Sequence, residues 1–176
     1  ELRKELKVPV GLILCAWGAT CVEPWIPAEA YQQDEEMALY YQNNMMSEEE
    51  ERAEREATRR GWRPTAPSTI FNGMVNPVIP YAIKGAIWYQ GESNVGRADQ
   101  YQKLFPAMIK DWREKWNYDF PFYYVQIAPF QYNINKDALS DKSQKLREAQ
   151  RKSLKLKHTG MVVTLDIGNF NNIHPS

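Results

Sequence analysis

Four short runs of mostly apolar residues recur along the chain and are separated by longer polar stretches. Each run has the length of a single buried strand and falls well short of the roughly 18 apolar residues that a membrane-spanning helix needs. The first run ends in the small-residue turn Trp17-Gly18-Ala19-Thr20, as is typical of a strand buried in a parallel sheet. We therefore predict strands over residues 8–15, 82–89, 120–128 and 160–167.

Helical patterns lie between these runs. Residues 99–116 place apolar side chains three and four positions apart, and residues 141–156 repeat this pattern more weakly. Residues 31–60 are strongly charged, with acid-before-base pairs such as Glu48/Arg52, and predict a solvated helical insertion. The alternation of strands and helices predicts an α/β domain with a mostly parallel sheet and right-handed crossovers.

Composition limits the classes of partner. The 176 residues carry 22 basic and 22 acidic side chains, so the formal net charge is zero and neither nucleic acid nor a membrane surface is an expected partner. The length predicts one domain over residues 1–176. Cys15 and Cys21 are too few to staple a small secreted fold and lack a metal-ligand spacing, so we interpret them as free thiols.

Three segments follow predicted strands, at the position where open α/β sheets bind ligands. The first segment is residues 17–25 and the third is residues 166–175. The second, Gln90-Gly91-Glu92-Ser93-Asn94, supplies amide, acid and hydroxyl groups suited to a developing oxyanion. Alternatively, Ser93 or Asn94 caps the next helix. A nucleophilic role for Ser93 is disfavoured, because the motif lacks the second glycine of a nucleophile elbow.

His174 is the histidine best placed for chemistry. It lies in a polar loop beyond the last predicted strand, where an imidazole can reach a nucleophile and act as a general base. The alternative is a surface histidine without a catalytic role. The other histidine, His158, precedes a strand within a basic stretch and is interpreted as structural. With one candidate histidine, we expect no zinc site and no other cofactor.

The order of the motifs along the chain resembles that of a known family. Residues 8–13, followed by Trp17-Gly18-Ala19-Thr20 and Glu23-Pro24-Trp25, are similar to a stretch of sialate O-acetylesterase-type carbohydrate esterases that usually reads Ser-Trp-Gly-Gly-Thr and then Glu-Ala-Trp. The resemblance covers nearly the whole chain outside the charged helix. Its further motifs, in the family's order, are Asn72-Gly73-Met74-Val75-Asn76-Pro77, Lys84-Gly85-Ala86-Ile87-Trp88-Tyr89-Gln90-Gly91-Glu92-Ser93-Asn94, Asp111-Trp112-Arg113, Leu146-Arg147-Glu148-Ala149-Gln150, Asp166-Ile167-Gly168 and Ile173-His174-Pro175.

This resemblance implies an SGNH hydrolase domain, a three-layer α/β/α flavodoxin-like fold that hydrolyses acetyl esters on sialic acid or other sugars without a metal. By position, His174 matches the general base, which takes the serine proton and returns it to the leaving sugar hydroxyl. Gly18 matches the turn whose backbone amide is expected at the oxyanion hole. Gln90, Glu92 and Asn94 match the motif that completes this hole and shapes the acetyl pocket. The implied partner is an acetylated carbohydrate, and the family is commonly periplasmic, secreted or lysosomal.

The chain is also rich in aromatic residues, with 6 Trp, 10 Tyr and 6 Phe. Flat amphipathic rings often line sugar clefts, but they also fill cores. Trp17, Trp25 and Trp62 are therefore candidates for stacking on a sugar, whereas Trp88 lies on a predicted buried strand and is interpreted as a core residue.

The sequence departs from the family pattern at three places. The family's serine lies in a Gly-Gln-Ser-Asn-Met motif upstream of the Val-Pro-Val-Gly strand, and these 176 residues contain no such motif. Asn171 and Asn172 stand where an Asp is expected before the histidine, and Asp166 lies further back in the predicted strand. An amide can hold an imidazole but cannot stabilise imidazolium as a carboxylate does. Ala19 replaces the second glycine of the turn, which matters if that position needs a positive φ.

Two interpretations remain open. In the first, the chain is the central and C-terminal part of an esterase, incomplete at both ends and inactive without its nucleophile segment. In the second, it is a non-catalytic carbohydrate-binding relative, which Asn172 favours. Retention of residues 90–94 and of His174 favours the first interpretation. A third class, a protein-interaction module centred on residues 31–60, rests on the charge pattern alone.

Overall fold

A parallel three-stranded sheet forms the centre of the protein. The computed structural model describes residues 1–58, 64–130 and 141–173. Its strands are β1 (Ala86–Tyr89), β2 (Phe122–Val125) and β3 (Thr159–Val162), in the order β1-β2-β3. In the parallel register, Phe122 pairs with Ala86 on one side and with Thr159 on the other. The sheet confirms three of the four predicted strands, each shorter than its apolar run.

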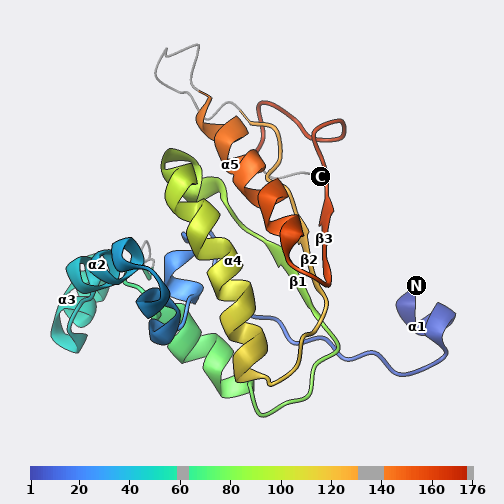
Figure 1. Cartoon of the computed structure of the whole chain (residues 1–176), viewed down its shortest axis with the longest axis horizontal. Coiled ribbons are helices and arrows are strands. Elements are labelled where there is room, and N and C mark those ends of the chain that lie inside the picture. Colours follow the sequence, from blue (N-terminus) through green and yellow to red (C-terminus); the bar gives the residue numbers. More distant parts are fainter. Residues whose placement is uncertain (59–63, 131–140, 174–176) are drawn as a thin grey trace.

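Two long helices cover one face of this sheet (Figure 1). α4 (Ala98–Lys115) follows β1 and α5 (Lys142–Lys152) precedes β3, so each lies in the crossover that a pair of parallel strands requires. Trp88 faces these helices and is buried, whereas Ile87 and Tyr123 point to the opposite face and are 80% and 55% exposed. The α/β class with a parallel sheet is therefore confirmed, and the described residues form the sheet and one helical layer.

The core between the sheet and the helices is built largely from aromatic rings. Trp88 lies at its centre, in edge contact with Trp25 and Trp112 at ring-centroid distances of 5.2 and 5.8 Å. Phe105 and Phe122 pack around the same ring. Trp88 is thus a core residue, as predicted. The prediction that Trp25 stacks on a sugar is wrong, because this ring is only 3% exposed and is enclosed by the core.

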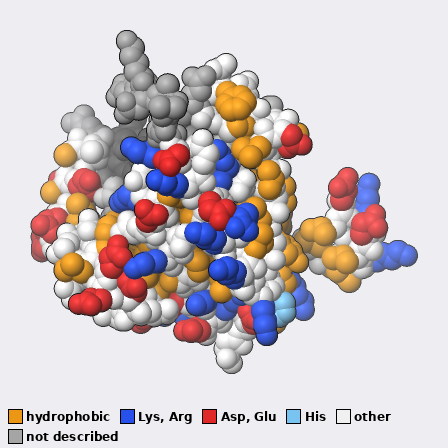
Figure 2. Space-filling view, turned by 45° about the horizontal axis from the view of Figure 1, so that its top comes forward, with side chains coloured by type: hydrophobic (Ala, Val, Ile, Leu, Met, Phe, Trp, Pro, Cys, Tyr) orange, Lys and Arg blue, Asp and Glu red, His pale blue; other side chains and the backbone are white. Residues whose placement is uncertain are grey.

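The first predicted strand, residues 8–15, is not a strand. Its residues form no regular element, and Leu12 and Leu14 are 87% and 86% exposed. The segment leads away from the body to α1 (Leu2–Leu6), which stands apart from the rest of the molecule (Figures 1 and 2). An apolar run becomes a strand only where a neighbouring strand exchanges hydrogen bonds with it. Within the described sheet, β1 pairs with β2 alone.

In the described part of the charged stretch, residues 31–58, there are two α-helices, α2 (Glu35–Asn44) and α3 (Glu48–Thr58), rather than one. The break is explained by a capping box at the start of α3. The backbone N–H of Ser47 donates to Glu50 Oε2 at 2.8 Å, and the backbone N–H of Glu50 donates to Ser47 Oγ at 3.2 Å. These two bonds satisfy free N–H groups at a new helix start, so the chain turns here instead of continuing α2.

Tyr31 belongs to the core rather than to the charged segment. Its side chain is fully buried in η2 (Ala28–Gln33), and its hydroxyl donates to the Glu23 carbonyl at 2.7 Å. Among the described residues, no helix combines the length and the apolar character needed to cross a bilayer. Further short helical turns of the described chain are η1 (Glu23–Trp25), η4 (Phe71–Val75), η5 (Asn76–Val78), η6 (Glu92–Arg97) and η7 (Ser153–Lys155).

Candidate active site

The loop after β1 lies against the turn at residues 17–20. The Gln90 side chain donates from Nε2 to the Thr20 carbonyl at 3.1 Å, and the Ser93 hydroxyl donates to the Ala19 carbonyl at 3.2 Å. Gln90 is buried, whereas Ser93 is exposed. Two of the three predicted segments therefore meet beyond the C-terminal end of β1, where an open α/β sheet is expected to bind its ligand.

Asn94 is the centre of this contact. Its Oδ1 accepts hydrogen bonds from the Val22 backbone N–H at 2.9 Å and from Gln90 Nε2 at 2.7 Å, and its Nδ2 donates to Glu23 Oε2 at 2.9 Å. The side chain is buried, so these bonds are made away from water. The alternative prediction of a helix cap at this motif is wrong, because neither η6 nor α4 has a side-chain cap. We call Asn94 and its three partners, Val22, Gln90 and Glu23, the Asn94 network.

An ion pair between the buried Glu23 and the exposed Arg97 holds the Asn94 network from the other side. The Glu23 carboxylate is fully buried, and its Oε1 lies 3.0 Å from Arg97 Nη2. The same nitrogen donates to Cys21 Sγ at 3.1 Å. Burial and the Glu23 charge raise the pKa of the Cys21 thiol, against the opposing effect of Arg97, and Cys21 is a free cysteine as predicted. Because a buried charge is costly without its partner, the pair fixes the Glu23 carboxylate and, through it, the Asn94 amide.

The turn at residues 17–20 contains a left-handed residue. Ala19 has a φ of 58°, a conformation that costs a residue with a Cβ about 1 kcal/mol relative to glycine. The Thr20 hydroxyl holds the turn, since it donates to the Trp17 carbonyl at 2.9 Å and accepts from Trp25 Nε1 at 3.0 Å. The alanine that replaces the family's second glycine therefore occupies a position that does need a positive φ. Gly18 beside it is exposed to open space.

Gly91 allows the loop to pass close to α5. Its φ is 152°, and a Cβ there would lie 2.7 Å from Ile127 Cγ2 and 3.2 Å from Gln150 Nε2. Gln150 is fully buried, donates to the Gln90 carbonyl at 3.2 Å and accepts from the Ile127 N–H at 3.1 Å. Gln150 was not a predicted site residue. The available signal was a polar side chain beside Leu146 on the apolar stripe of an amphipathic helix.

The remaining predicted residues lie at the margin of the network or beyond the described chain. Glu92 is partly buried, and burial together with the Glu92 charge raises the pKa of the neighbouring Tyr89 hydroxyl to about 12. Asp166 and Asn172 are exposed in the chain that follows β3. His174, the predicted general base, and Trp62, a predicted sugar-stacking residue, lie outside the described residues.

The whole chain matches one protein family. The family model described as "Carbohydrate esterase, sialic acid-specific acetylesterase" matches residues 1–176. The chain belongs to this family. It is 28% identical to human sialate O-acetylesterase over 194 residues, which is 99% of the chain and 34% of that relative. The mouse sialate O-acetylesterase is 29% identical over 198 residues, or 97% of the chain and 37% of the relative.

A solved structure of a carbohydrate esterase shares the fold. A carbohydrate acetylesterase from Xanthomonas citri matches with a TM-score of 0.75 at 33% identity, over 99% of this chain and 34% of that chain. The chain therefore spans about a third of the length of the relatives that it matches. These relatives are carboxylic ester hydrolases by name.

One of the motifs on which the sequence resemblance rests supports the framework of the site. In Asp111-Trp112-Arg113 of α4, Trp112 Nε1 donates to the Trp25 carbonyl at 3.1 Å and joins α4 to the segment that carries Glu23. The Arg113 guanidinium donates to two backbone carbonyls that precede β2 and β3, those of Phe120 and His158, each at 3.0 Å. The motif therefore ties the long helix both to the sheet and to the first site segment.

Proposed function

We propose that this chain is part of a carbohydrate O-acetylesterase and forms one wall of its active site. The observation that supports this best is the Asn94 network, which joins the loop after β1 to the turn at residues 17–20 through buried side chains. Buried polar groups that are held in one arrangement are what the stabilisation of a developing oxyanion requires. The activities named for the relatives support an acetyl ester of sialic acid or another sugar as the substrate.

In the proposed reaction, a serine hydroxyl attacks the acetyl carbonyl while His174 accepts the serine proton. The bond between the acetyl carbon and the sugar oxygen then breaks, and His174 returns the proton to that oxygen. Water, activated by the same histidine, attacks the acetyl-enzyme and releases acetate and the serine. The serine belongs to a segment outside these 176 residues.

The residues of this chain have separate tasks in that reaction. The backbone amide of Gly18 donates to the oxyanion, and the open space around Gly18 supports access of a substrate there. Gln90 and Glu92 line the acetyl pocket. Asn94 is a positioning residue, because both its amide oxygen and its amide nitrogen already bond within the network. Trp17, which is 37% exposed, remains a candidate for stacking on the sugar.

A second candidate is a non-catalytic carbohydrate-binding relative. Asn172 favours it, because an amide cannot stabilise a protonated His174 as the usual carboxylate does. Under this alternative, the site binds an acetylated sugar and releases no acetate. If the parent polypeptide does release acetate, Asn172→Asp tests the missing acid: a higher kcat would assign the orienting position to residue 172, and an unchanged kcat would place the acid elsewhere.

The test is acetate release by the parent polypeptide that contains this chain. We expect hydrolysis of 4-nitrophenyl acetate and of an O-acetylated sugar, and a decrease in kcat of about a thousandfold or more in His174→Ala. His158→Ala, which removes the histidine directly before β3, should retain most of the activity. A parent polypeptide that binds acetylated sugar but releases no acetate would overturn the esterase and establish the binding protein.

A further inference from the structure

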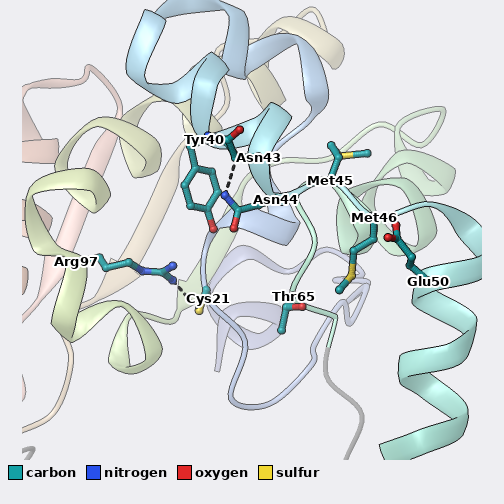
Figure 3. A pocket seen from close by; sticks show the side chains of 9 residues that line it. All are labelled: Cys21, Tyr40, Asn43, Asn44, Met45, Met46, Glu50, Thr65 and Arg97. Carbon is teal, nitrogen blue, oxygen red and sulfur yellow. Dashed lines mark hydrogen bonds between the residues drawn. The ribbon is translucent and has the colours of Figure 1, made fainter.

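A cavity of about 500 Å³ lies beside the Asn94 network (Figure 3). Cys21 and Arg97 form one side of it, and the end of α2 with the turn before α3 forms the other. Small-molecule sites commonly have volumes of roughly 300–1,000 Å³. The size and the position next to the proposed acetyl site make this cavity a candidate for another part of the substrate.

The part of the cavity lining that the structure describes carries no excess of positive charge. Arg97 lines it, but its Nη2 is already paired with the Glu23 carboxylate at 3.0 Å and bonded to Cys21 Sγ. The Glu50 carboxylate lies on the other side of the cavity and accepts from the Ser47 N–H. Among the described residues, one cation faces two carboxylates, and a free carboxylate or phosphate needs uncompensated positive charge. The electrostatics therefore favour a neutral ligand.

The uncharged part of the lining has polar groups that suit the hydroxyl groups of a sugar and apolar groups that suit its C–H face. The amides of Asn43 and Asn44 can donate to and accept from hydroxyl groups. The thioether side chains of Met45 and Met46 and the ring of Tyr40 supply apolar surface for the C–H face of a sugar. Both kinds of side chain line the same cavity, so a single ring can contact both kinds of surface.

We propose that this cavity is a subsite for a neutral sugar ring of the substrate. The proposal rests on the proposed function, because it places the ring next to the acetyl group that the esterase would cleave. Cys21 of the cavity directly follows Thr20 of the turn, and Arg97 holds the carboxylate to which Asn94 donates. The same framework therefore positions the sugar and the turn. In this proposal, α2 forms the outer wall of the substrate site.

The first test is an NMR titration of this chain, labelled at its methionine methyl groups, with neutral methyl glycosides. We expect saturable shifts at Met45 and Met46 and none at Met108, which is fully buried in the core. The anionic methyl glycoside of sialic acid should bind more weakly than the neutral probes. An absence of saturable shifts, or tighter binding of the anionic probe, would overturn the proposal.

Two variants at neighbouring positions of α2 test whether the sugar binds in this cavity. Asn43→Ala removes an amide from the cavity lining and should raise the dissociation constant about fivefold, as expected for the loss of one hydrogen bond. Gln42→Ala removes an exposed amide that does not line the cavity and should leave the dissociation constant unchanged. Equal effects of the two variants would contradict a site in this cavity.

Kinetics of the parent polypeptide separate this proposal from the proposed function. Asn43→Ala should raise the KM for an O-acetylated neutral sugar about fivefold and lower the preference for that ester over 4-nitrophenyl acetate by the same factor. If the parent polypeptide releases no acetate while neutral sugars still shift Met45 and Met46, the esterase fails and the subsite stands. If acetate is released but neither the KM nor the methyl resonances change, the subsite is wrong and the esterase stands.

Discussion

Asn94 donates from Nδ2 to the buried Oε2 of Glu23 at 2.9 Å. This bond joins the loop after β1 to the segment that follows the 17–20 turn in the chain. This bond determines the orientation of the amide. If the amide were flipped, its oxygen would face the carboxylate, which has no proton to donate in its ionised form. In the observed orientation, Oδ1 accepts from Val22 and Gln90. The position of Arg97, which pairs with Glu23, is thereby linked to that of Gln90.

We expect Asn94→Ala to lower the free energy of unfolding by about 2–4 kcal/mol, because it leaves the Val22 N–H and the Glu23 carboxylate without this partner in the interior. Urea unfolding measures the change. Ser93→Ala is the matched control: this exposed neighbour loses a single bond of 3.2 Å and should change stability by less than about 1 kcal/mol. Equal stability of the two variants would mean that the network contributes little to the fold.

Ala19→Gly should stabilise the protein. The φ of 58° is unfavourable for alanine and open to glycine, and the gain should outweigh the greater chain entropy of glycine in the unfolded state by several tenths of a kcal/mol up to about 1 kcal/mol. Thermal unfolding is a sufficient measurement. Ala16→Gly, in the same exposed segment but without a positive φ, should be neutral or destabilising. A decrease in melting temperature for Ala19→Gly would show that the turn tolerates alanine without strain.

Most of the sheet could be predicted from apolar runs, and the exception has a physical cause. Residues 8–15 are as apolar as the segments that became β1, β2 and β3, yet they form no strand in the described structure. Strand formation depends on a hydrogen-bonding neighbour that is distant in sequence, and a local pattern does not contain this information. The break between α2 and α3 was readable as the Ser47-to-Glu50 capping box, but the surrounding helical charge pattern obscured it.

The candidate site was predictable to a similar extent. The contacts of Gln90 with Thr20 and of Asn94 with Val22 bring together two segments that the sequence placed at one edge of the sheet, although the strand predicted before the first of them did not form. The Glu23–Arg97 pair did not follow, since each is one charge among 22 acidic and 22 basic side chains and the two lie far apart in sequence. The burial of Glu23, which makes the pair important, is a property of the folded chain alone.

Gly91→Ala should be strongly destabilising, by about 2 kcal/mol or more. The new Cβ would meet Ile127 Cγ2 at 2.7 Å, and the φ of 152° is a conformation that alanine rarely adopts. Gly96→Ala, in the short helix η6 that follows Gly91, provides the control, because a Cβ there has no atom within 4 Å and the φ is not positive. Denaturant unfolding of both variants should show a large loss for the first and little change for the second. Similar losses would contradict the close approach of the loop to α5.

Asp111 makes the stability of the protein depend on pH. Its side chain is 4% exposed, and Oδ2 has no hydrogen-bond partner among the described residues. Burial raises the pKa of Asp111 from 3.8 to about 6, against the attraction of Lys115 and with smaller contributions from Glu29 and Glu114. The unfolded chain therefore releases this proton at a lower pH than the folded protein does. The contribution of Asp111 to stability is fully present below about pH 4 and is lost as the pH rises through 6.

Asp111→Asn should remove this dependence. At pH 8 the variant should be more stable than the wild type by an amount on the order of 2 kcal/mol, and the difference should shrink as the pH falls toward 4, because the wild-type carboxyl is then neutral as well. Free energies of unfolding in urea, measured across this pH range, test the expectation. Asp99→Asn removes the same charge from an exposed position at the start of α4 and should give no comparable trend. A difference between the wild type and Asp111→Asn that stays constant from pH 4 to pH 8 would show that Asp111 is already ionised throughout this range in the folded protein.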